Sequence, residues 1–186
     1  MGGVDKGLVL FHGRPLVAHV AAVLEPQVGR VVVSANREHG RYAALGYSVV
    51  ADRWSDYRGP LAGLASALDI ANTDYALVVP CDTPCLPADL LARLGEGLTA
   101  NDAEVAVARA GGQVHHLCAL MTRSLAGPLY QDVEAGFKKV VDWWSRCAVA
   151  FVDFPDPRAF VNLNTLEELA SLESVQVPAT SANQLA

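Results

Sequence analysis

Acidic, hydroxyl and amide side chains lie just past the ends of three apolar segments of the chain. They are Ser34 and Asn36 at the first segment, Asp52 at the second and Asp82 at the third. In an open parallel sheet, ligands bind outside the carboxyl ends of the strands. Loop solvation would explain any one of these side chains alone, but three such strand ends together favour one shared binding crevice.

Asp82 has the most specific chemistry among these residues. It follows the apolar segment 75–79 and precedes a turn at Thr83-Pro84. A carboxylate at the end of a buried strand suits Mg²⁺, which takes one or two protein carboxylates together with substrate phosphate oxygens and water. An aspartate here can also shape the turn by hydrogen bonding to the backbone, and the two roles are compatible.

Two further segments carry groups that suit a phosphorylated or heterocyclic ligand. Gly2 and Gly3 allow backbone N–H groups to converge on a phosphate, and Lys6 adds a positive charge. This segment matches neither the P-loop nor the dinucleotide fingerprint, and a glycine-rich amino terminus is commonly just a loose end. Asn162 and Asn164 alternate on one face of a short extended segment, which suits either a polar heterocycle or a turn.

The cysteines and histidines do not form a recognisable site. Cys81 and Cys85 are joined by no second thiol pair and no suitably spaced histidine pair, so zinc binding is not expected. His115 and His116 are adjacent, and neighbouring side chains on a strand point to opposite faces, so they cannot chelate together. The sequence also has no nucleophile elbow and no Ser-His-Asp arrangement.

The elements that must position these residues alternate between strands and helices. Unbroken apolar runs are typical of strands that helices cover on both faces, so the first half predicts a doubly wound α/β sheet. An antiparallel strand pair around Gly111-Gly112 is expected in the second half. The predicted strands are 29–34, 47–50, 75–79, 103–108 and 114–120, and the predicted helices are 15–24, 61–70, 87–94, 125–135, 138–144 and 166–172.

Composition limits the class of protein. The chain has 186 residues, 52% of them hydrophobic, and a formal net charge of -6. This length fits one domain, and the negative charge disfavours binding to nucleic acid or to an anionic membrane surface. No apolar run approaches the roughly 20 residues of a membrane span, and the first residues lack the apolar core of a signal peptide. We expect a cytoplasmic protein with reduced cysteines.

Several motifs, in order, closely resemble the molybdenum cofactor guanylyltransferase family. The resemblance runs from residue 1 to about residue 172, and its motifs lie at 1–7, 13–16, 59–63, 80–84 and 162–169. It implies a Rossmann-like three-layer nucleotidyltransferase sheet, mostly parallel, with an antiparallel addition in the C-terminal half. It also implies one domain over 1–173, divided into a nucleotide-binding part over about 1–100 and a pterin-side part over about 101–173, with a tail at 174–186.

The same resemblance implies an Mg²⁺-dependent transfer of GMP from GTP to molybdopterin. Lys6 would contact the GTP phosphates, Asp52 would help to hold the nucleotide, and Asp82 would bind Mg²⁺, so that Lys6 and Asp82 are the expected catalytic residues. Asn162 and Asn164 resemble the pterin-side residues of the family. The residues expected to bind the nucleotide are Gly2, Gly3, Lys6, Asn36, Asp52 and Asp82.

The sequence departs from the family pattern at three places. Ser34 stands where the family commonly has asparagine, which leaves Asn36 or the backbone to contact the base, and His116 is followed by leucine where the family usually has proline. Family members begin with an apolar strand and a glycine-rich loop ahead of the Met-Gly-Gly motif, whereas this sequence begins at that Met1. We therefore expect a sheet that lacks one central strand, with low stability and weak activity.

Alternative functions are a cytidylyltransferase acting on the same pterin, a sugar-1-phosphate nucleotidyltransferase, and a non-catalytic carrier of nucleotide or cofactor. GTP and molybdopterin are the expected small-molecule partners, and molybdoenzyme maturation proteins are the expected protein partners. We expect a monomer that binds neither nucleic acid nor a membrane.

Overall fold

The structure is a computed structural model of the chain, and it describes residues 5–54, 56, 58–163 and 168. Gly2, Gly3 and Asn164 lie outside the described residues, as does the predicted helix 166–172 apart from Glu168. The described elements are η1 (Lys6–Leu8), β1 (Leu10–Phe11), β2 (Arg14–Pro15), α1 (Leu16–Leu24), β3 (Val32–Ser34), α2 (His39–Ala44), β4 (Ser48–Val50), α3 (Pro60–Asp69), β5 (Tyr75–Val78), α4 (Leu90–Ala100), β6 (Val105–Ala110), β7 (Gln113–Thr122), η2 (Arg123–Leu125), α5 (Ala126–Glu134), α6 (Val140–Trp144), β8 (Val149–Phe154) and η3 (Pro157–Phe160).

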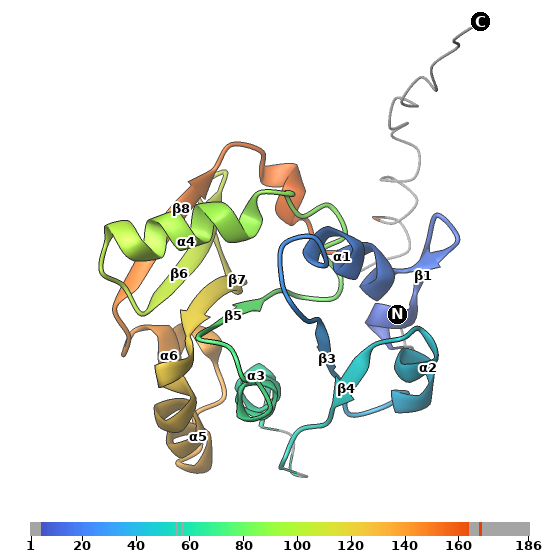
Figure 1. Cartoon of the computed structure of the whole chain (residues 1–186), viewed down its shortest axis with the longest axis horizontal. Coiled ribbons are helices and arrows are strands. Elements are labelled where there is room, and N and C mark those ends of the chain that lie inside the picture. Colours follow the sequence, from blue (N-terminus) through green and yellow to red (C-terminus); the bar gives the residue numbers. More distant parts are fainter. Residues whose placement is uncertain (1–4, 55, 57, 164–167, 169–186) are drawn as a thin grey trace, which may run out of the picture.

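The described strands form one larger sheet and two smaller ones. The larger sheet has the order β5-β7-β6-β8, in which β7 is antiparallel to β5 and β6, and β8 is parallel to β6. Strands β3 and β4 form a separate parallel pair, and β1 and β2 form a short antiparallel hairpin. Figure 1 shows the β3–β4 pair beside the larger sheet, with β5 as the nearer strand of that sheet.

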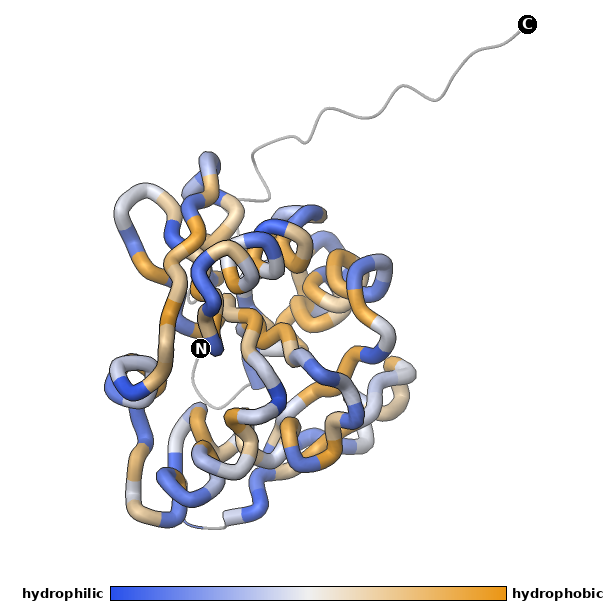
Figure 2. Tube along the Cα trace, turned by 60° about the vertical axis from the view of Figure 1, so that its left-hand side comes forward, coloured by the Kyte–Doolittle hydropathy of each residue, from blue (hydrophilic) through white to orange (hydrophobic). Residues whose placement is uncertain are grey.

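Helices cover both faces of the larger sheet, which explains why every residue of β6 except Arg109 is apolar. Val105 and Val107 pack with α3, α5 and α6 on one face. Ala106, Ala108 and Ala110 pack with α1 and α4 on the other. The two groups of helices lie on opposite sides of the strands (Figure 1), and hydrophobic segments run through the interior while many hydrophilic ones lie at outer turns (Figure 2). The arrangement has three layers.

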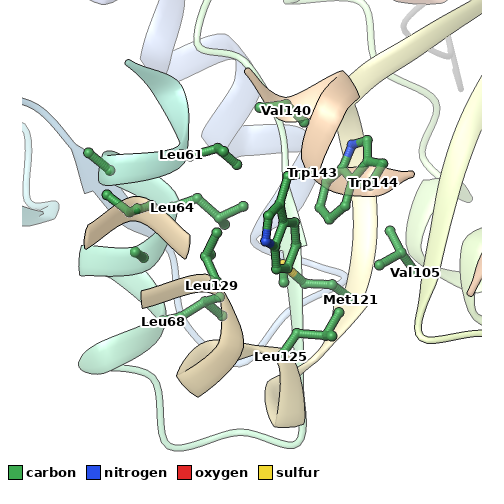
Figure 3. Packing of buried hydrophobic residues seen from close by; sticks show 14 of the residues in the cluster. Leu61, Leu64, Leu68, Val105, Met121, Leu125, Leu129, Val140, Trp143 and Trp144 are labelled. Carbon is green, nitrogen blue, oxygen red and sulfur yellow. The ribbon is translucent and has the colours of Figure 1, made fainter. Parts of the chain in front are cut away.

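The α3 face holds the largest buried side chains. Leu61, Leu64 and Leu68 of α3 face Leu129 of α5 and Trp143 of α6 (Figure 3). Trp143 is only 1% exposed, and its indole N–H still reaches a hydrogen-bond acceptor, as a buried tryptophan requires. This packing fixes the position of α3, whose amino end lies at the site described below.

A cavity of about 1140 Å³ separates the two sheets. Residues of β3 and β5 line it on facing sides, and among the described residues no strand pairs with either of these two edges. Apolar side chains of α1, α3 and α4 line its walls. Polar side chains lie at both of its ends: Arg30, Asn72 and Thr73 come before β3 and β5, and a second group lies at a rim beyond the carboxyl ends of the strands. The sheet that lacks a central strand, the low stability and the weak activity stay predictions from the sequence.

The predicted α/β class is confirmed, with parallel strands and an antiparallel addition that includes the pair around Gly111-Gly112. Helix α2, strand β8 and the β1–β2 hairpin were not predicted from the sequence. In the part of the chain that the structure describes, no helix has the length and apolarity to cross a bilayer.

Candidate functional site

The polar rim of the cavity brings together most of the residues that the sequence analysis singled out. Lys6 lies in η1, Asn36 and Asp52 follow β3 and β4, and Asp82 and Asn162 come from the loops after β5 and η3. All five line the same cavity. Strands β3, β4 and β5 bring their carboxyl ends to this rim, so side chains that are up to 156 positions apart in the chain meet there.

Asn36 and Asp52 form a reciprocal pair at the ends of β3 and β4. The Asn36 Nδ2 group donates to Asp52 Oδ2 at 2.7 Å, and the backbone N–H of Asp52 donates to Asn36 Oδ1 at 2.8 Å. The backbone N–H of Ala35 continues the ladder by donating to the carbonyl of Val50 at 2.9 Å. These bonds fix both side chains at the edge of the cavity. Ser34, at the end of β3, also lines it.

Lys6 and Asp82 form an ion pair on the opposite side of the rim. The Nζ atom of Lys6 lies 3.5 Å from Asp82 Oδ2, and the side chain of Asp82 is 11% exposed against 47% for that of Lys6. Because the Asp82 carboxylate is largely buried, loss of the Lys6 ammonium would leave its negative charge less compensated. A substrate that brings negative phosphate oxygens, or a cation that binds Asp82, would change the balance of charge at this point.

The loop after β5 is tied to the segment that contains Asn162. The backbone N–H of Leu163 donates to the carbonyl of Asp82 at 2.9 Å, and the Thr83 hydroxyl donates to Asn162 Oδ1 at 2.7 Å. Leu163 is fully buried, which anchors the segment in the core. The amide oxygen of Asn162 is thus held by Thr83 at the rim of the cavity.

The amino end of α3 contributes a part of the site whose residues were not among the predicted site residues, because the sequence at 56–63 is explained mostly by a turn capped by proline. Gly59, Pro60 and Gly63 line the cavity, and the amino end of a helix favours negatively charged groups. Gly63 lies so close to the ends of β3 and β4 that a Cβ atom on it would stand 2.6 Å from Ser34 Oγ and 3.2 Å from Asp52 Oδ1. The motif at 59–63, with a glycine inside the first turns of the helix, was the available signal.

The donor set at Asp82 fits a divalent cation that is shared with a substrate. Among the described residues, no three His, Cys, Asp or Glu side chains come together as a metal site. A complete protein cage is therefore not formed by these residues. Mg²⁺ commonly binds through one or two carboxylates and completes its coordination with phosphate oxygens and water, and the single buried carboxylate of Asp82 meets that requirement.

The cysteines are thiols with little tendency to ionise. All four are free, and burial raises the pKa of the Cys81 thiol to about 11, with the nearby carboxylate of Asp82 acting in the same direction. Cys81 also lines the cavity. A thiol with a raised pKa carries little thiolate at neutral pH and is a weak nucleophile.

Comparisons of sequence with known proteins give a consistent result. A family model described as the MobA-like NTP transferase domain matches residues 1–148. A molybdenum cofactor guanylyltransferase from Shewanella loihica is 43% identical over 173 residues, which are 92% of this chain and 88% of that protein. Its counterpart from Shewanella halifaxensis is 40% identical over 173 residues, covering 92% of this chain and 86% of that protein.

Comparisons of structure agree on the fold. The crystal structure of molybdopterin-guanine dinucleotide biosynthesis protein A from Archaeoglobus fulgidus matches with a TM-score of 0.73 at 21% identity, over 93% of this chain and 91% of that one. A CMP:2-keto-3-deoxy-manno-octonic acid synthetase complexed with CTP matches with a TM-score of 0.71 at 12% identity, over 91% of this chain and 90% of that one. At these identities the likeness concerns the fold alone.

Proposed function

The chain belongs to the MobA-like NTP transferase family, among the molybdenum cofactor guanylyltransferases, and we propose that it transfers GMP from GTP to molybdopterin. In this reaction an oxygen of the molybdopterin phosphate attacks the α-phosphorus of GTP. The bond from that phosphorus to the bridging oxygen of the β-phosphate breaks, and pyrophosphate leaves. The observation that carries the proposal is the single cavity rim that holds Lys6, Asn36, Asp52, Asp82 and Asn162.

Lys6 and the amino end of α3 are the proposed phosphate-binding groups. Transfer of a phosphoryl-type group depends mainly on positioning and on neutralisation of charge. The Lys6 ammonium lies at the rim with Asp82, where it can approach the triphosphate and stabilise the negative charge that develops on the leaving pyrophosphate. The attacking oxygen is already anionic, so the reaction needs no strong general base. Gly2 and Gly3 are proposed to add backbone donors to this part of the site.

Asp82 is the proposed protein ligand of Mg²⁺. A bound Mg²⁺ would neutralise negative charge on the triphosphate. The side chain of Asp82 is largely buried and its carbonyl accepts a hydrogen bond from Leu163, so the carboxylate has a fixed position. A fixed carboxylate loses little conformational freedom when it binds a cation.

The nucleoside and the pterin are proposed to occupy opposite parts of the rim. Asn36 and Asp52 hold each other through two hydrogen bonds and are positioned to bind the nucleoside. Asn162, held through its oxygen by Thr83, directs donors toward the pterin, and Asn164 is proposed to act beside it. A cytoplasmic location, a monomeric state and binding to molybdoenzyme maturation proteins stay predictions from the sequence.

Other nucleotides are the closest alternatives, because the fold neighbours include a protein in complex with CTP. The test is to measure pyrophosphate release from GTP, CTP or UTP with and without purified molybdopterin and Mg²⁺. We expect release only with GTP, molybdopterin and Mg²⁺ together. Equal release from CTP would instead support a cytidylyltransferase, and nucleotide binding without release would support a carrier.

Two matched variants test the role of Asp82. Asp82→Asn removes the carboxylate charge at the rim and should lower the rate by about 100-fold or more, a typical effect for loss of a group that stabilises charge in the transition state. Asp153→Asn is the control, because Asp153 is also paired with a cation, Arg109, but lies on β8 and does not line the cavity. Full activity of Asp82→Asn would exclude the proposed metal role.

A further inference from the structure

Tyr42 is a buried tyrosine on α2 whose hydroxyl group has a specific partner near the site. The side chain is only 2% exposed, and its hydroxyl donates to Asp5 Oδ1 at 2.5 Å. The two residues are 37 positions apart in the chain, so this bond joins α2 to the amino-terminal turn. Figure 1 shows α2 next to that turn.

Asp5 in turn controls the conformation of the residue that follows it. It is the N-cap of η1, the single turn that begins with Lys6, and its side chain accepts a hydrogen bond from the backbone N–H of Gly7 at 3.3 Å. The backbone closes the same turn, because Leu8 donates to the carbonyl of Asp5 at 3.1 Å. The carboxylate that receives the Tyr42 hydroxyl therefore also fixes the direction in which Lys6 leaves the backbone.

The close packing around Tyr42 leaves this connection little freedom. A Cβ atom on Gly7 would stand 2.5 Å from the Tyr42 hydroxyl oxygen, so the tyrosine lies directly against the turn. Tyr42 shares a buried cluster with Leu8, Val17 and Val33. Burial and the bond to Asp5 both raise the pKa of the Tyr42 hydroxyl above its ordinary value, so the group remains a protonated donor.

We infer that Tyr42 is a positioning residue for the transfer reaction. Through Asp5 it holds the η1 turn in the conformation that places the Lys6 ammonium 3.5 Å from Asp82, where the substrate phosphates bind. This inference rests on the proposed function for its substrate. It assigns a role to a residue that lies in the core and reaches the site only through two other side chains.

The variant Tyr42→Phe keeps the ring and removes only the hydroxyl group. Loss of a hydrogen bond to a charged group that orders a phosphate-binding lysine should lower kcat/KM for GTP by about 10-fold. The matched control is Tyr47→Phe, which removes a hydroxyl from a tyrosine that packs against the same cluster and leaves the bond to Asp5 in place. The control should keep kcat/KM within about 2-fold of the wild-type value, since neutral surface changes are small.

A double-variant cycle with Lys6 separates positioning from a general loss of structure. Tyr42→Phe should weaken binding of inorganic triphosphate by about 10-fold in the wild-type background and have no further effect in the Lys6→Ala background. Calorimetric titration measures the binding, and thermal unfolding of each variant shows that it is folded. An equal effect in both backgrounds would overturn the inference, as would wild-type affinity in Tyr42→Phe or failure of the wild-type chain to bind triphosphate.

The two kinds of failure are distinguishable. If the wild-type chain binds triphosphate but releases no pyrophosphate from GTP and molybdopterin, the proposed function fails while the binding cycle still tests Tyr42. If the wild-type chain is active and Tyr42→Phe matches it in both activity and triphosphate affinity, the inference fails while the proposed function stands.

Discussion

Replacement of Gly63 by alanine should weaken nucleotide binding without unfolding the protein. The added Cβ atom would stand 2.6 Å from Ser34 Oγ and 3.2 Å from Asp52 Oδ1. Ser34 must turn to another rotamer or move by about 0.8 Å to restore an ordinary contact of roughly 3.4 Å. Asp52 must yield by a few tenths of an ångström, which strains its paired hydrogen bonds with Asn36.

The expected size of the effect follows from two opposing contributions to stability. Overpacking costs about 1–3 kcal/mol, while replacing glycine inside a helix by alanine returns about 1 kcal/mol, so the net loss in unfolding free energy should be at most about 2 kcal/mol. A displaced hydrogen-bonding group costs about 1.4 kcal/mol in binding, which is a factor of about 10 in the Kd for GTP. Calorimetric titration with GTP and urea denaturation measure the two effects separately.

Gly95→Ala is the matched control for this experiment. Gly95 also lies inside a helix, α4, but a Cβ atom there would meet only Leu120 Cδ2 at 3.9 Å, an ordinary contact. This variant should gain up to about 1 kcal/mol in stability and bind GTP with the wild-type Kd. If Gly63→Ala also binds GTP with the wild-type Kd, the β3–β4 end of the rim does not hold the nucleotide.

Gly97→Ala should lower the free energy of unfolding by about 1–3 kcal/mol relative to Gly95→Ala in urea denaturation, because its Cβ atom would overlap Val152 Cγ2; equal stabilities would contradict this packing. Alkylation by iodoacetamide at pH 8 should label the exposed Cys85 before Cys118, because burial raises the pKa of the Cys118 thiol to about 12 and leaves little thiolate; peptide mass spectrometry measures the order, and the reverse order would refute the reasoning. A chain extended at its amino terminus by an apolar strand should show a higher melting temperature, because the added strand can pair with the facing edges of β3 and β5. An unchanged melting temperature would show that the added strand does not pair with these edges.

The position of the site was predictable from sequence because it follows from local patterns and one general rule. Apolar runs mark the strands, and their carboxyl ends must meet if the strands are parallel. Asn36, Asp52 and Asp82 accordingly lie at one cavity. The functional assignments of these residues stay proposals, since their placement alone does not show what they bind.

The missed features depend on contacts between distant parts of the chain. Strand β8 was not predicted, although Val149–Phe154 alternates in burial over much of its length, because it follows two helices and pairs with the much earlier strand β6. Helix α2 has a single buried residue, Tyr42, and begins after Glu38 in a left-handed conformation, so it has no apolar stripe to detect. Nothing local indicates that Tyr42 reaches Asp5.

Strands β3 and β5, whose facing edges have no partner strand in the described part of the chain, have a consequence for how the molecule responds to its ligand. A nucleotide at the rim would contact Asn36 and Asp52 on one side of the cavity and Asp82 on the other. It would therefore hold the two sheets together. Binding of that kind stabilises the folded state by mass action. Saturation with GTP should therefore slow amide hydrogen exchange in β3 and β5 and suppress the edge-to-edge aggregation to which open strands are prone.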